Sequence, residues 1–428
     1  MPDGERLRTP GWQWAYAVFK LADGLTHALF PLAVLFVYGK PVWAVAALAA
    51  AMNLASVPAS FAWAKVMERG RGRRRAAVLG FAVSAAVLSA LVLEPGFWPF
   101  VALAVLFTLF GTATAPAASI LALEGVPRNR WGAATGAMSR RTGYAFLLGV
   151  TVTVGLGLAG LLDFRVMFAV GALLAATAAG AAWATIRPFE GGSTGPRRYE
   201  EGVVVEGQRR FERAVFFPTR LRYRPTWQGV RRALLADPGP FLLATSALFF
   251  GTVVFLASYP GVLDQRLGLT AGLILLAQAP SAFLTPLTYT YAGRVGDRQG
   301  VSRGAAIGSL IRLLTVPALC LVVLAFGADG FLALLILHGL LGVSFAFIQV
   351  NGPCLVAALH PGGRGEGVGA YHAAVAVGTL TGSVVSAAVL LLWDLRVSYA
   401  VAAGATVLGG VLALVTLRRL AQDPALAV

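Results

Sequence analysis

Apolar runs of about 20 residues recur along the whole chain, and this feature constrains its fold most. Each run is long enough to cross a bilayer hydrocarbon core of roughly 30 Å. Because a backbone in lipid must satisfy its own polar groups, each run is predicted to be helical. No run alternates apolar and polar residues as membrane strands do. The sequence therefore predicts an all-α membrane protein with twelve transmembrane helices, at about 11–38, 42–64, 76–93, 97–123, 131–158, 164–186, 240–260, 270–292, 304–327, 330–359, 366–391 and 395–418.

The composition and the placement of charge agree with a membrane chain. Of the residues, 57% are hydrophobic and 13% are charged, whereas soluble domains carry about 25% charged residues. The net charge of +16 also fits a nucleic-acid binder, but most of the 35 Lys and Arg fall in the termini or in every second connection. The alternate connections hold only Lys40, Arg165, Arg266 and Arg396. This positive-inside pattern predicts a multi-pass protein of the cytoplasmic (inner) membrane, with both termini in the cytoplasm and no nucleic-acid partner.

Motifs of catalysis and cofactor binding are missing from the sequence. It contains no Walker lysine loop, no HExxH and no nucleophile elbow. Its two cysteines, Cys320 and Cys354, lie in apolar runs without a metal-binding spacing. We therefore expect neither an enzyme nor a bound cofactor.

The chain divides into two related halves. Residues 1–186 and 240–428 each hold six predicted helices, and 187–239 form a basic cytoplasmic linker whose end, TWQGVRRALLAD, is predicted to be an interfacial helix. The stretch AKVMERGRGRR from Ala64 aligns without a gap with GRVGDRQGVSR from Gly293, and Pro31 and Pro260 are separated by the same number of residues. PRNRWGAATGA and PGGRGEGVGA form a second similar pair. Three similarities in the same order indicate duplication.

The stretch from Gly293 resembles the signature loop of the major facilitator superfamily, which lies between helices two and three and is repeated between helices eight and nine. The two Pro-x-x-Arg stretches resemble that superfamily's connections from four to five and from ten to eleven. The resemblance implies two pseudo-symmetric six-helix bundles and a cytoplasmic gate in which Asp297 meets helix five near Arg130, and Glu68 meets helix eleven near Arg364. The rest of the gate would be Arg69, Gly293 and Arg298. The alternative is that these charges only fix the topology.

Ionisable residues inside the predicted helices are candidates for the transport site, because a charge at mid-bilayer costs about 2.5–3.5 kcal/mol. Lys20, Asp23 and His27 share one face of helix one. Asp23 is about 18 Å from the start of helix one, and Arg140 and Arg141 are about 14–15 Å into helix five. These depths predict that Asp23 pairs with one of the two arginines. Asp23 would couple protons, and the arginine would either bind an anionic group of the substrate or keep Asp23 ionised. The alternatives are a permanent structural ion pair and snorkelling side chains.

The second half offers polar candidates for the same site: Gln278, His338, Gln349 and Tyr371. They either contact the substrate or bond across helices as packing. Arg312 in helix nine is predicted to be structural. The spacings Gly132-x-x-x-Gly136 and Gly378-x-x-x-Gly382 permit close helix contact.

These observations predict a secondary transporter that moves a small anionic or zwitterionic organic solute by alternating access, as proton-coupled export. Its partners would be the solute, protons and the lipid bilayer, and it would act as a monomer. Helix five lacks the Gly-Pro pair of the superfamily's drug antiporters, and helix four lacks their arginine. One alternative is a divalent metal-ion transporter using Asp23 and His27 with His338 or Cys354. Another is a non-transporting membrane sensor.

Overall fold

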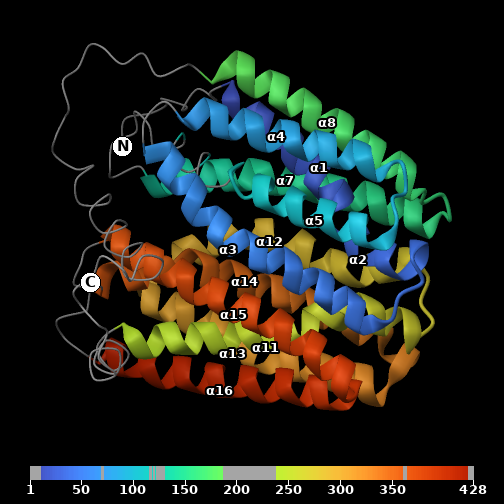
Figure 1. Ribbon diagram of the computed structural model, residues 1–428. Coiled ribbons are helices and arrows are strands. Elements are labelled where there is room, and N and C mark those ends of the chain that lie inside the picture. Colours follow the sequence, from blue (N-terminus) through green and yellow to red (C-terminus); the bar gives the residue numbers. More distant parts are fainter. Residues whose placement is uncertain are drawn as a thin grey trace, which may run out of the picture. The chain divides into compact units, whose positions relative to one another are not determined.

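The structure is a computed structural model, and it describes residues 11–68, 72–114, 118, 121, 131–186, 238–359 and 364–422. Every regular element in these residues is helical (Figure 1). Ten helices are long and apolar enough to span a membrane, and two predicted spans hold the shorter apolar stretches Val42–Ser56 and Phe97–Gly111. The prediction of an all-α membrane protein with twelve transmembrane helices is confirmed. The predicted linker helix lies outside the described residues.

The chain forms two compact units, and the first contains Met1–Phe30, Pro58–Leu156 and Leu161–Gly191. Within it α4 packs against α5 and α8, and α1 packs against α8. Phe30 lies in its core, with ring centroids 5.2 Å from Phe107 and 5.9 Å from Phe168. The helices of this part are α1 (Trp12–Thr26), α2 (Leu29–Leu32), the end of α3 (Val42–Glu68), α4 (Gly72–Leu91), α5 (Phe97–Gly111), α7 (Trp131–Leu158) and α8 (Phe164–Thr185).

The second unit contains Pro31–Val57, Gly157–Gly160 and Gly192–Val428. It begins with a π-helix, Ala33–Val37, and the first part of α3. A short 3-10 turn, Gly327–Gly330, joins α13 to α14. Its long helices are α11 (Gly239–Gln265), α12 (Ala271–Gln299), α13 (Val301–Ala325), α14 (Phe331–Leu359), α15 (Arg364–Leu392) and α16 (Leu395–Ala421).

Glycines allow α11 to pack closely against its neighbours in the second unit. A Cβ at Gly378 of α15 would lie 2.3 Å from the Ser246 carbonyl oxygen, and one at Gly382 would lie 2.6 Å from that of Phe250. Gly251 of α11 faces α16 in the same way, at 2.6 Å from the Ala402 oxygen. The predicted close contact at the Gly378-x-x-x-Gly382 spacing is therefore confirmed.

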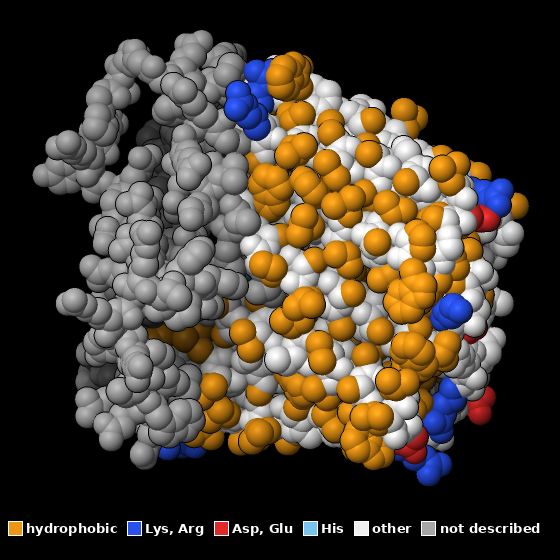
Figure 2. All heavy atoms as spheres, in the orientation of Figure 1, with side chains coloured by type: hydrophobic (Ala, Val, Ile, Leu, Met, Phe, Trp, Pro, Cys, Tyr) orange, Lys and Arg blue, Asp and Glu red, His pale blue; other side chains and the backbone are white. Residues whose placement is uncertain are grey.

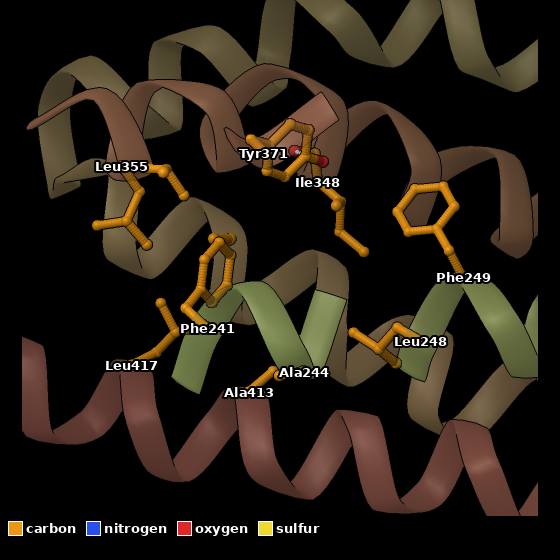
Figure 3. Packing of buried hydrophobic residues seen from close by; sticks show 11 residues of the cluster. Phe241, Ala244, Leu248, Phe249, Ile348, Leu355, Tyr371, Ala413 and Leu417 are labelled. Carbon is orange, nitrogen blue, oxygen red and sulfur yellow. Dashed lines mark hydrogen bonds between the residues drawn. The ribbon is translucent and has the colours of Figure 1, made fainter. Parts of the chain in front are cut away.

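Large apolar side chains point both inward and outward, as expected for helices in lipid. The core of the second unit contains a cluster that includes Phe241, Leu248 and Tyr371 (Figure 3). Other large apolar side chains, such as Leu173 and Leu408, are exposed, and hydrophobic side chains are scattered over the described part of the face in Figure 2. So many exposed large apolar side chains on long apolar helices fit contact with lipid tails.

Candidate transport site

Asp23 is the centre of a charged cluster on one face of α1. Its Oδ2 lies 2.7 Å from Lys20 Nζ, and its Oδ1 lies 3.8 Å from His27 Nδ1. The three residues are spaced i, i+3 and i+7, so they follow one another along a single helical stripe. The Asp23 side chain is only 14% exposed, whereas those of Lys20 and His27 are 40% and 67% exposed. A shielded carboxylate is therefore flanked by two more accessible nitrogen groups.

Two glycines bring α1 and α7 into backbone contact beside Asp23. A Cβ at Gly24 would lie 2.1 Å from the Phe146 carbonyl oxygen, and one at Gly149 would lie 2.4 Å from that of Leu21. The Thr153 hydroxyl donates a hydrogen bond of 3.0 Å to the Leu25 carbonyl. The helix segment that carries the carboxylate is therefore held tightly against α7.

The arginines of α7 lie at a different level from Asp23. Arg141 donates a hydrogen bond to Gln13 Oε1, and Arg140 is exposed. Both Gln13–Arg141 and Leu25–Thr153 join residues 128 positions apart, so α1 and α7 run parallel with this register. The α7 residue level with Asp23 is then about ten residues, or about 15 Å, beyond Arg141.

The predicted pairing of Asp23 with Arg140 or Arg141 is therefore wrong. Within the described residues, the only groups that form ion pairs with Asp23 are Lys20 and His27. The prediction failed because it measured depth from the two helix starts and assumed that both starts lie level. The glycine contact sets the register instead, and one helical turn brings Lys20 Nζ to 2.7 Å from the Asp23 carboxylate.

Two of the four polar candidates from the second half are interior residues of the second unit. Tyr371 is fully buried in the cluster of Figure 3, and its hydroxyl donates to the Ile348 carbonyl at 3.1 Å. His338 is buried and stacks on Tyr259, with ring centroids 5.2 Å apart. Gln278 and Gln349 are half-buried, and Gln278 donates to the Ile274 carbonyl at 3.4 Å. In this conformation Tyr371 and His338 act in packing, and the two glutamines are more accessible.

The predicted gate stretch is helical over most of its length. α12 runs to Gln299, and only Gly300, at φ 90°, separates it from α13. Gly293 and Gly296 therefore lie within α12 and not in a loop between two helices. Arg298 is exposed. Arg69 and Arg130 lie outside the described residues, as do the side chains of Glu68, Asp297 and Arg364, so the gate contacts stay a prediction.

Asn351 of α14 organises this end of the second unit, a role that sequence reasoning missed. Its side-chain amide donates to the carbonyls of Ala292 (3.3 Å) and Phe347 (3.0 Å). A Cβ at Gly296 or Gly304 would lie within 2.6 Å of an Asn351 side-chain atom. The available signal was a lone asparagine within an apolar helix, together with glycines in the two helices that join at Gly300. The structure brings this asparagine and these glycines together.

The metal-ion alternative needs several ligands close together, from Asp23, His27 and either His338 or Cys354. In the part of the chain that the structure describes, no three His, Cys, Asp or Glu side chains lie close enough together to hold a metal ion. The Asp23–His27 pair comes from the first unit, whereas His338 and Cys354 belong to the second. The metal-ion alternative therefore rests on sequence spacing alone.

Solved structures with the same fold are transporters. The nucleoside transporter NupG matches with a TM-score of 0.68 at 13% identity, covering 95% of this chain and 98% of that one. A POT family transporter in complex with 5-aminolevulinic acid matches with a TM-score of 0.68 at 14% identity, covering 100% and 99%. The peptide transporter POT matches with a TM-score of 0.67 at 15% identity, covering 98% and 96%. At these identities the likeness shows the fold alone.

A family model settles the classification that the fold suggests. No curated protein matches this sequence. The model described as Major Facilitator Superfamily matches residues 14–285, which is more than half of the 428 residues. It includes the charged stripe of α1, the α1–α7 crossing and the first part of the second unit. The chain therefore belongs to the Major Facilitator Superfamily, and it is a multi-pass secondary transporter of a small molecule rather than an enzyme.

Proposed function

We propose that this protein is a proton-coupled transporter of small anionic or zwitterionic organic solutes, in which Asp23 and Lys20 form the coupling pair. The observation that carries the proposal is the ion pair of 2.7 Å between a shielded carboxylate and a more accessible ammonium. An ionisable pair within a membrane-spanning helix is costly and is a functional candidate for that reason. The proposal keeps the predicted halves, 1–186 and 240–428, with the linker 187–239 and both termini in the cytoplasm.

The pair supports a specific coupling step. While Asp23 is ionised, its charge holds the Lys20 ammonium. Protonation of the carboxylate removes that charge, and the ammonium becomes free to bind the carboxylate or other anionic group of a solute. His27, with its imidazole nitrogen 3.8 Å from the other Asp23 oxygen, is placed to deliver the proton. Proton and solute therefore bind together, and alternating access carries both across the membrane.

This step bears on the direction of transport. The export predicted from the sequence requires proton and solute to bind in turn, whereas the ion pair supports their binding at the same time. Cotransport along an inward proton gradient is therefore the mode that the geometry supports best. Export by exchange stays a prediction, and it would suit a solute whose amine competes with Lys20 for Asp23.

A solute must first be found for this site. We would screen purified protein by thermal shift against nucleosides, short peptides and amino acids that include 5-aminolevulinic acid. These are the kinds of compound with which the three structural neighbours are named. A hit would then be supplied to proteoliposomes loaded with a pH-sensitive dye. Cotransport acidifies the lumen when the solute is added outside, and exchange makes it more alkaline.

The test of the coupling pair is Asp23→Asn, with Asp329→Asn as a matched control because Asp329 is an exposed aspartate of the second unit. Asparagine resembles the protonated carboxyl group, so the variant should lose uptake driven by a pH gradient and keep solute counterflow without one. Lys20→Gln should lose both. The control should keep both. Gradient-driven uptake that survives unchanged in Asp23→Asn would refute the assignment.

A further inference from the structure

Arg312 is a fully buried cation in the second unit. Its side chain lies about 16 Å along α13, and the residue is 1% exposed. Nε donates to the Ser344 hydroxyl of α14 at 3.2 Å, and the guanidinium lies 4.5 Å from the centre of the Phe249 ring of α11. Nη1 has no hydrogen-bond partner among the described residues. No carboxylate of the described residues forms an ion pair with Arg312 either.

The groups around the guanidinium do not neutralise it. The Ser344 hydroxyl donates to the Gly308 carbonyl at 2.8 Å, and the Tyr371 hydroxyl donates to the Ile348 carbonyl at 3.1 Å. Both residues are fully buried, and Phe249 is nearly so. The face of the Phe249 ring offsets part of the positive charge. A guanidinium stays protonated in proteins, so its buried charge has no counter-ion in the part of the chain that the structure describes.

We propose that Arg312 holds a small monovalent anion inside the second unit, through the free N–H groups of Nη1. The anion is either an inorganic ion of the size of chloride or a small carboxylate. The burial of Arg312, Ser344 and Phe249 favours a compact ion over a large organic one. This site is separate from Asp23, and its existence does not depend on the proposed coupling. The burial of Arg312 and its bond to Ser344 agree with the structural role predicted for it, and the anion site goes beyond that role.

The experiment is thermal unfolding of the full chain in detergent at constant pH and ionic strength. Sodium gluconate would be replaced stepwise by sodium chloride in one series and by sodium formate in the other. A bound anion at concentration c stabilises the folded state by RT ln(1 + c/Kd), so the melting temperature should rise with the logarithm of the anion concentration above Kd, by roughly 2–4 °C over the series. A rise with chloride identifies an inorganic ion, and a rise with formate alone identifies a carboxylate.

Three variants locate the effect. Arg312→Met should abolish the dependence on the anion, and in gluconate it should melt no lower than wild type, because an unpaired buried charge has been removed. Ser344→Ala keeps the charge and should keep the response. Arg418→Gln, at an exposed arginine near the end of α16, is the matched control and should behave as wild type.

Two results would overturn the inference, and the first needs no variant to fold. Equal melting temperatures of the wild type in chloride, formate and gluconate would show that no small anion binds. A full chloride response in Arg312→Met would show that the anion binds elsewhere. Neither result touches the proposed role of Asp23, which is tested by solute uptake.

Discussion

The crossing of α1 and α7 yields the sharpest quantitative prediction, through the substitution Gly24→Ala. The added Cβ would lie 2.1 Å from the Phe146 carbonyl oxygen, which is a backbone atom and cannot rotate away. To restore a contact of about 3.2 Å the two helices must separate by about 1 Å. Overpacking of this kind costs roughly 1–3 kcal/mol, and we expect the melting temperature to fall by several degrees.

The matched control for this substitution is Gly180→Ala in α8. A Cβ at Gly180 would meet nothing within 4 Å, so this substitution changes the helix propensity of one residue and leaves the helix contacts as they are. Alanine is favoured over glycine within a helix by about 0.5–1 kcal/mol, and Gly180→Ala should melt at or slightly above the wild-type temperature. The assay is thermal unfolding of both purified variants in the same detergent. If Gly24→Ala melts as high as Gly180→Ala, the close contact of α1 and α7 is not real.

Two further predictions concern individual contacts. Arg165 donates a hydrogen bond to Glu94 and lowers the pKa of that carboxyl. The contact therefore stabilises the folded state at any pH above the pKa of Glu94 in the unfolded chain, and the stabilisation is lost as the pH falls through the lower pKa of Glu94 in the folded state. A pH series of melting temperatures should show wild type and Glu94→Gln differing at neutral pH and converging in acid, and a constant difference would contradict this. Asn351→Ala should lower the free energy of unfolding by about 1–3 kcal/mol, because buried carbonyls lose their donor. In a melting experiment Gln349→Ala, at a half-buried neighbour, should change little, and equal losses would count against a special role for Asn351.

Most of the fold could be predicted because its signals are local. The length and polarity of each apolar run decide whether a helix spans the bilayer. The resemblance of the stretch from Gly293 to a signature loop pointed to the correct family, and the Gly378-x-x-x-Gly382 spacing marked a real helix contact. Each of these features is readable within a few tens of residues.

The candidate site was harder to predict because it depends on how helices align. The register of α1 and α7 comes from the backbone contact at Gly24 and Gly149, and no count from the helix starts could reveal it. When nearly every position of a helix is apolar, helical periodicity does not tell which of its few polar residues point into the protein. Buried Tyr371 and half-buried Gln278 were therefore equivalent candidates at the level of the sequence. The Asp23–Lys20 pair is local, and its spacing in the sequence was sufficient to find its members.

The single residue between α12 and α13 has a mechanical consequence. With Gly300 as the whole connection, the end of α12 and the start of α13 stay within one residue of each other, so a displacement of one end carries the other end along. Spin labels placed on α12 and α13 near this junction should keep a constant separation whichever side of the membrane the protein opens to. The two labelled positions would then provide a fixed reference distance for measuring movements elsewhere in the molecule.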